Sequence, residues 1–123
     1  MNVWLVVAAL NGAMAVAAGA FAAHGLEARL DAHAHEIFET GARYHMYHAF
    51  AIALAALAMR GPAAEFARYA AVLFLAGIVF FSGSLYVVAL SHWRSAAFIT
   101  PMGGLFFLAG WILLAWAGWK VRI

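Results

Sequence analysis

The sequence predicts an all-α fold, an integral membrane four-helix bundle, and three observations carry this prediction. Hydrophobic residues make up 68% of the 123 residues and charged residues only 10%, whereas a soluble domain is nearer half apolar and one quarter charged. The apolar residues fall in four continuous runs, and about 20 such residues suffice for a helix to cross a bilayer. Strands of a transmembrane barrel would instead alternate apolar and polar residues in segments of about ten.

The four runs predict four spans, which are residues 2–23, 41–59, 66–90 and 101–119 of a single domain covering residues 1–123. No Lys or Arg precedes the long first run, which argues against a cleaved signal peptide. Arg60-Gly61-Pro62 predicts a turn between the second and third spans. Thr100-Pro101 predicts the start of the last helix, with Thr100 as the N-cap and Pro101 as the first helical residue.

Residues 24–43 are the longest polar stretch, and we interpret them as an amphipathic segment along the membrane interface that leads into the second span. Glu39 and Arg43 are four residues apart there, which favours an exposed ion pair. His33 and His35 are interpreted as part of a solvated face of this segment.

The basic residues predict how the chain sits in the membrane. With four spans, both termini and the turn near residue 61 share one side, which carries four Lys and Arg residues against three on the other side. Because cytoplasmic ends carry the excess of positive charge, we predict that both termini are cytoplasmic. The basic residues are scattered, so they indicate no nucleic-acid partner, and the absence of cysteine excludes disulfides and thiolate chemistry.

Antiparallel crossing predicts that most polar side chains in the spans gather at one end of the bundle, the extracytoplasmic end. The members of this polar cluster are His24, Tyr44, His48, Ser82, Ser84, Tyr86 and Thr100, and His45 lies at the same end. Three histidines can hold a metal ion, so His24, His45 and His48 are candidate ligands. Rings of His and Tyr also form hydrogen bonds at headgroup level, and we prefer this structural interpretation, which predicts no cofactor.

Small and polar residues inside the spans predict helix contacts. Asn11 lies near the middle of the first span, where a polar side chain is costly and usually faces a partner helix. Gly19, Gly83, Gly103 and Gly104 are predicted to let helix backbones approach closely. Four short spans bury little surface within one chain, so we expect association with further copies to form a homo-oligomer.

Four segments carry a resemblance to a known family. They are Gly19 to Leu26 (GAFAAHGL), Tyr44 to His48 (YHMYH), Phe81 to Tyr86 (FSGSLY) and Thr100 to Gly104 (TPMGG). In this order and over nearly the whole chain, they resemble the family called domain of unknown function 423, the YgdD-like and transmembrane protein 256 group. The resemblance implies a four-helix, multi-pass protein of the bacterial plasma membrane and implies no activity. That family often carries Gln at position 45, where this chain has His45, which argues against a metal site shared by the family.

These features together favour a non-enzymatic membrane protein that acts through packing or protein contacts. Acidic residues and nucleophiles do not converge anywhere in the sequence, which argues against an enzyme. A small oligomeric transporter or channel is an alternative, although no charged residue lies deep in a span and no internal repeat is evident. A haem- or metal-binding protein using His24, His45 and His48 is a further alternative.

Overall fold

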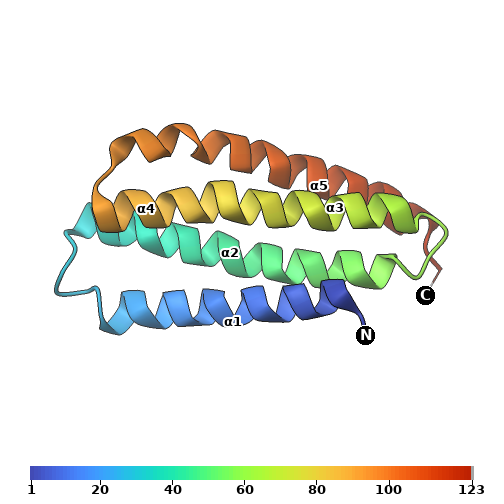
Figure 1. The fold of residues 1–123 in the computed structure, drawn as a ribbon, viewed down its shortest axis with the longest axis horizontal. Coiled ribbons are helices and arrows are strands. Elements are labelled where there is room, and N and C mark those ends of the chain that lie inside the picture. The colour runs from blue at the N-terminus through green and yellow to red at the C-terminus, as the bar shows by residue number, and fades with distance from the viewer. Residues whose placement is uncertain (123) are drawn as a thin grey trace.

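The computed structural model describes residues 1–122, and the chain is helical over that range, without strands. Four long helical segments run side by side and are joined by short connections (Figure 1). They are α1 (Val3–His24), α2 (Ala32–Ala58), a third segment made of α3 (Ala64–Gly77), the π-helical turn η1 (Ile78–Ser82) and α4 (Gly83–Ser91), and α5 (Thr100–Lys120), preceded by the 3-10 turn η2 (Arg94–Phe98). The all-α prediction is therefore confirmed.

Three of these segments are long and apolar enough to cross a membrane, namely Val3–His24, Ala64–Ser91 and Arg94–Lys120. They contain nearly all of the predicted spans 2–23, 66–90 and 101–119. The predicted span 41–59 lies almost entirely within α2, whose apolar half follows a polar half that begins at Ala32. The polar half lowers the hydropathy of this helix, so α2 is not among the three.

The interfacial prediction implied a separate helix for the polar stretch 24–43, and the structure does not show one. The chain turns between residues 25 and 31, and residues 32–43 are the first part of the single helix α2. Asp31 begins this helix by accepting a hydrogen bond at Oδ1 from the backbone N–H of Ala34, 2.8 Å away, the usual role of an N-cap aspartate. Gly41 does not end the helix. A Cβ at Gly41 would lie 3.0 Å from the Tyr86 ring, so this glycine lets α4 approach closely.

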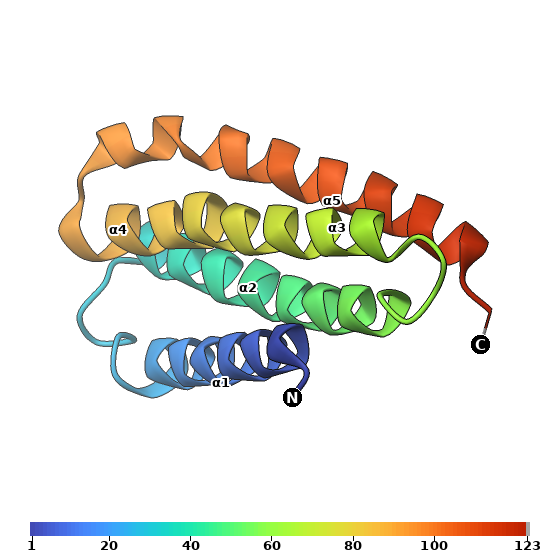
Figure 2. The same ribbon diagram turned by 45° about the vertical axis from the view of Figure 1, so that its right-hand side comes forward.

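The four segments form a bundle that is open on one side. Segment α2, the third segment and α5 pack against one another, whereas α1 packs chiefly against α2. Both termini and the turn at residues 59–63 lie at one end, and the connections 25–31 and 92–99 lie at the other (Figures 1 and 2). One face of α1 is therefore left without a neighbour in the chain.

Small side chains dominate the contacts between the helices. The main core cluster contains Ala51, Ala55, Ala70 and Ala71, with Phe74 completely buried among them. Without a strong hydrophobic force between helices in lipid, small residues permit the close contact that holds such helices together. Large apolar side chains point outward instead, and Leu105 and Ile112 of α5 are 66% and 70% exposed.

The π-helical turn widens the third segment at the level where α5 crosses it. The N–H of Gly83 donates to the carbonyl of Ile78, five residues earlier, in place of the usual four. A Cβ on Gly103 would clash with the backbone of Phe81, and a Cβ on Gly77 would clash with the Phe107 ring. The closest approach of α5 to its neighbour therefore depends on two glycines, one on each side of the contact.

Candidate functional site

Three of the predicted polar residues form a hydrogen-bonded chain across three helices. His45 of α2 places Nδ1 3.1 Å from the hydroxyl of Tyr86 on α4 and Nε2 3.0 Å from Oδ1 of Asn11 on α1. Nδ2 of Asn11 in turn donates to the carbonyl of Val7, 2.9 Å away. The predicted interhelical role of Asn11 thus has its partner in His45.

The partners of this chain fix the direction of each hydrogen bond. Because Nδ2 of Asn11 donates to a carbonyl, Oδ1 of Asn11 is the acceptor, and Nε2–H of His45 donates to it. When the imidazole is neutral, Nδ1 of His45 then has no proton and accepts from the hydroxyl of Tyr86. Both ring nitrogens are occupied by these two contacts. We call Tyr86, His45 and Asn11 the three-helix chain.

His48 lies one turn further along α2, and both of its ring nitrogens are also hydrogen-bonded. Its Nδ1–H donates to the carbonyl of Tyr44, 2.7 Å away, so Nε2 is left to accept from the indole N–H of Trp111 at 3.1 Å. The ring stacks on Phe107 with 3.4 Å between ring centroids and 5° between planes. The sequence analysis did not pair Trp111 with His48, because nothing in the spacing of residues 48 and 111 relates them.

Ser84 and Thr100 link the third segment to α5. The hydroxyl of Ser84 donates to the carbonyl of Phe81, 2.9 Å away, and is also hydrogen-bonded to the hydroxyl of Thr100. The prediction that Thr100 is an N-cap is wrong. Helix α5 begins at Thr100 with Ile99, which has no polar side-chain atom, at the cap position, and the Thr100 hydroxyl is hydrogen-bonded to Ser84.

Ser82 stands apart from these pairs. It lies at the end of the π-helical turn and is completely buried, and its hydroxyl has no hydrogen-bond partner within the described residues. Such a group carries a desolvation cost without compensation. Ser82 belongs to the polar cluster by position, but it adds no link between helices.

The structure does not bring the three candidate metal ligands together. His24 is exposed as the last residue of α1, whereas His45 and His48 are buried in contacts with other residues. No group of three His, Cys, Asp or Glu side chains within residues 1–122 could hold a metal ion. The alternative of a metal site built from His24, His45 and His48 therefore has no geometric support.

The predicted packing glycines divide into two kinds. Gly103 lies at the tight contact with Phe81, as described above. A Cβ at Gly19 or Gly104 would have no atom within 4 Å, and one at Gly83 would meet only the carbonyl of Ile78 at 3.8 Å. Within one chain, the predicted close-packing role thus holds for Gly103 and not for the other three.

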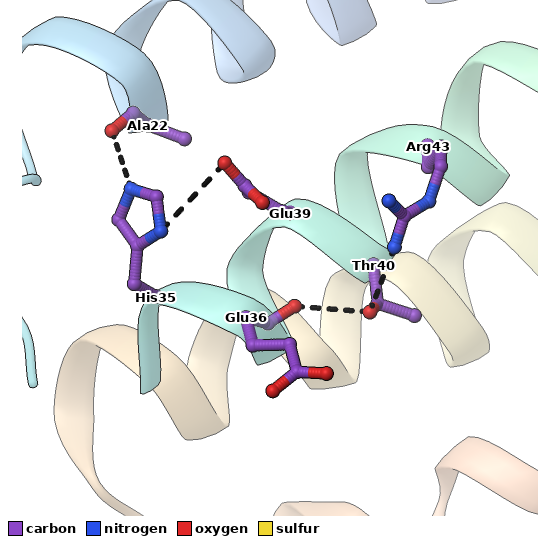
Figure 3. Close-up of polar contacts among 6 residues, drawn as sticks. All are labelled: Ala22, His35, Glu36, Glu39, Thr40 and Arg43. Atoms are coloured by element: carbon purple, nitrogen blue, oxygen red, sulfur yellow. Dashed lines mark hydrogen bonds and ion pairs between the residues drawn. The ribbon is translucent and has the colours of Figure 1, made fainter. Parts of the chain in front are cut away.

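A second group of polar contacts joins the start of α2 to the end of α1 (Figure 3). His35 donates from Nε2 to the carbonyl of Ala22, 2.8 Å away, and its Nδ1 lies 3.6 Å from Oε1 of Glu39. The interpretation of His35 as a solvated residue therefore missed a contact with the last turn of α1. Its separation from Ala22 crosses a turn, so no helical periodicity could reveal it.

The predicted ion pair between Glu39 and Arg43 is absent from the described residues. Arg43 instead donates to the hydroxyl of Thr40, 3.3 Å away, and that hydroxyl donates to the carbonyl of Glu36 (Figure 3). The carboxylate of Glu39 lies nearest to His35. Glu39 thus lies beside the residue four positions before it, His35, and is not paired with Arg43, four positions after it.

The interior polar groups therefore connect helices. Among the described residues, the buried polar side chains are Asn11, His45, His48, Ser82 and Ser84, with no Asp, Glu, Lys or Arg among them. Apart from Ser82, each is hydrogen-bonded to another residue of the chain. These contacts join α1 to α2, α2 to α4 and α5, and α4 to α5.

Comparison with known proteins places the chain in a family. Residues 18–104 match the family model described as "Protein of unknown function (DUF423)". The chain is 45% identical to a UPF0382 membrane protein of Haemophilus influenzae over 98% of this chain and 97% of that protein. It is 44% identical to the UPF0382 inner membrane protein YgdD of Escherichia coli over 89% of this chain and 84% of that protein.

A relative from Bacillus subtilis is similar over nearly its whole length. The UPF0382 membrane protein YwdK of Bacillus subtilis is 39% identical over 98% of both chains. No solved structure matches this chain. The family match and these relatives confirm the resemblance drawn from the four sequence segments, and the chain belongs to the DUF423 family of membrane proteins.

Proposed function

We propose that this protein is a non-enzymatic, four-span protein of the bacterial inner membrane that acts by associating with a second copy of itself. The observation that carries the proposal is that the interior histidines are hydrogen-bonded to other residues of the same chain. Both ring nitrogens of His45 and of His48 are engaged by neighbouring residues of the same chain. The polar cluster then serves to hold helices in register, and the action of the protein lies on its outer surface.

The placement of α2 supports four spans. At 1.5 Å per residue, its 27 residues reach about 40 Å, enough to cross a hydrocarbon core of about 30 Å. It lies between α1 and the third segment, and its polar first turns would lie at the headgroups on the side of the connection 25–31 (Figure 1). The excess of Lys and Arg at the opposite end favours cytoplasmic termini.

The open side of α1 supports association. Leu5, Ala9, Gly12 and Val16 recur at helical spacing on α1 and line an apolar groove of about 320 Å³ against Ala49 and Phe50 of α2. A Cβ at Gly12 would have no atom within 4 Å. A helix from a second copy could lie against this stripe, because the missing side chain permits close backbone contact.

The two alternatives have less support from the geometry. A channel or transporter needs polar groups that face a path, whereas Asn11 and His45 face each other. The hydrogen-bonded chain also ends at an Asn amide and a backbone carbonyl, which do not pass protons onward. A haem or metal site would need the engaged nitrogens of His45 and His48 to be released.

The experiment compares Gly12→Leu with Gly118→Leu by sedimentation velocity in a density-matched detergent. Both glycines have open space where a Cβ would lie, so we expect both substitutions to leave the fold of one chain intact. The proposal expects a dimer for the unsubstituted protein and for Gly118→Leu, and a monomer for Gly12→Leu. An unchanged dimer in Gly12→Leu, or a monomer throughout, would overturn the proposed association.

A further inference from the structure

A second polar site lies outside the three-helix chain, at the end of the bundle that carries the connections 25–31 and 92–99. A cavity of about 680 Å³ is formed there by the start of α2, the end of α4 and η2. Its volume lies within the range of about 300–1,000 Å³ that is usual for ligand pockets. We call it the loop-end pocket.

The loop-end pocket combines opposite charges with an apolar wall. Asp31, His33, His92 and Arg94 supply the polar lining, and Ile37 and Val88 supply part of the apolar lining. His92 ends α4 in the left-handed conformation, with φ of 57°, which turns the chain toward η2. The polar lining thus comes from three elements that only the fold brings together.

The two opposite charges in this pocket, on Asp31 and Arg94, do not form an ion pair with each other. Within residues 1–122, neither Asp31 nor Arg94 takes part in an ion pair, so their charged atoms lie more than 4.0 Å apart. Oδ1 of Asp31 is occupied by the N-cap hydrogen bond to Ala34, which leaves Oδ2 as a free acceptor. Arg94 makes no side-chain hydrogen bond in the same range and presents its guanidinium donors. A ligand that carries both signs of charge could bridge them.

From this complementarity we propose that the loop-end pocket binds a phosphoethanolamine group, as the headgroup of an ethanolamine phospholipid. The phosphate would pair with Arg94, since guanidinium binds phosphate by paired hydrogen bonds, and N–H groups of His33 and His92 would add donors. The ammonium would donate to Oδ2 of Asp31. Ile37 and Val88 favour a lipid over a soluble phosphate ester, because an apolar wall suits the adjoining glycerol and acyl atoms. This assignment rests on the membrane placement proposed above.

The test is native mass spectrometry of the detergent-solubilised protein titrated with phosphatidylethanolamine or phosphatidylglycerol, with soluble phosphoethanolamine as a separate competitor. The proposal expects phosphatidylethanolamine to bind about tenfold more tightly than phosphatidylglycerol, the factor that one charge-assisted hydrogen bond contributes. Soluble phosphoethanolamine should compete only weakly. Equal binding of the two lipids would overturn the proposal, and full displacement by the soluble compound would replace the lipid by a soluble phosphate ester.

Three variants locate the binding. Asp31→Asn keeps the N-cap, because Asn caps as well as Asp, and should abolish the preference for phosphatidylethanolamine. Arg94→Gln should weaken the binding of both lipids. Arg29 is an exposed arginine outside the pocket lining, so Arg29→Gln should leave the binding of both lipids unchanged. Equal effects of Arg94→Gln and Arg29→Gln would refute the pocket. Dimer formation, measured in the same samples, tests the proposed association separately, so equal binding of the two lipids by an unsubstituted protein that still dimerises counts against this pocket alone.

Discussion

At the scale of single residues, His45 joins three helices, because it contacts both Asn11 of α1 and Tyr86 of α4. Asn11 was predicted to meet a neighbouring helix, and His45 and Tyr86 were predicted to lie at one end of the bundle. The contact of His45 with both of them depends on the rotation of three helices about their axes, which hydropathy does not encode. Trp111 was missed as a partner of His48 for the same reason.

The three-helix chain predicts how substitutions of His45 behave. His45→Leu leaves Oδ1 of Asn11 and the hydroxyl of Tyr86 without partners, so the free energy of unfolding should fall by about 1–3 kcal/mol. His45→Gln supplies both a donor and an acceptor and should stay within about 1 kcal/mol of the unsubstituted protein. Unfolding by a titration of sodium dodecyl sulfate measures both. Equal losses in the two variants would show that the hydrogen bonds do not carry the effect.

Ser82 and Ser84 are a matched pair with opposite expected outcomes. Ser82→Ala removes a buried hydroxyl that has no partner and should raise the free energy of unfolding by about 1 kcal/mol. Ser84→Ala deprives the Thr100 hydroxyl of its contact and should lower it by about the same amount. Thermal melting followed by circular dichroism in detergent compares them. A loss of stability in Ser82→Ala would mean that its hydroxyl has a partner in the membrane-embedded protein.

At the scale of elements, the positions of the apolar helices followed from hydropathy, and the details of their ends did not. The predicted spans 2–23, 66–90 and 101–119 agree closely with helical segments, because long apolar runs leave little choice of structure. Residues 24–43 were predicted as a separate interfacial segment because they are polar, whereas residues 32–43 continue into the second span as the single helix α2. The π-helical turn at Ile78–Ser82, against which α5 packs, was also missed, because it leaves no mark in the residue pattern.

The close approach of α5 to the π-helical turn predicts different fates for two adjacent glycines. Gly103→Ala forces a methyl group against the backbone of Phe81 and should cost about 1–3 kcal/mol of stability. In Gly104→Ala the new methyl group points into open space. This substitution should raise the free energy of unfolding by about 0.5–1 kcal/mol, because alanine is more favourable than glycine within a helix. The same detergent unfolding measurement applies to both. Similar changes in the two variants would contradict the tight contact.

At the scale of the whole molecule, the open side of the bundle is the feature that sequence reasoning could not foresee. Small-residue stripes indicated helix contacts, but they did not reveal which of them one chain satisfies. Gly103 is used inside the chain, whereas Gly12 and Gly19 of α1 have open space where a Cβ would lie. Outward apolar residues such as Leu105 and Ile112 are exposed on α5 as well, but that helix has neighbours in the chain that α1 lacks.

Cysteine cross-linking in native membranes tests the proposed association most directly, because the chain contains no cysteine of its own. Single variants Ala9→Cys, Gly12→Cys and Val16→Cys would be oxidised with copper phenanthroline and compared with Ile112→Cys on α5. Residues near the axis of a two-fold interface lie close to their own copies, and a disulfide needs Cα atoms within about 7 Å. We predict disulfide-linked dimers from the α1 variants, strongest at Gly12→Cys, and none from Ile112→Cys. Absence of dimers from all three α1 variants, or equal cross-linking of Ile112→Cys, would contradict association through α1.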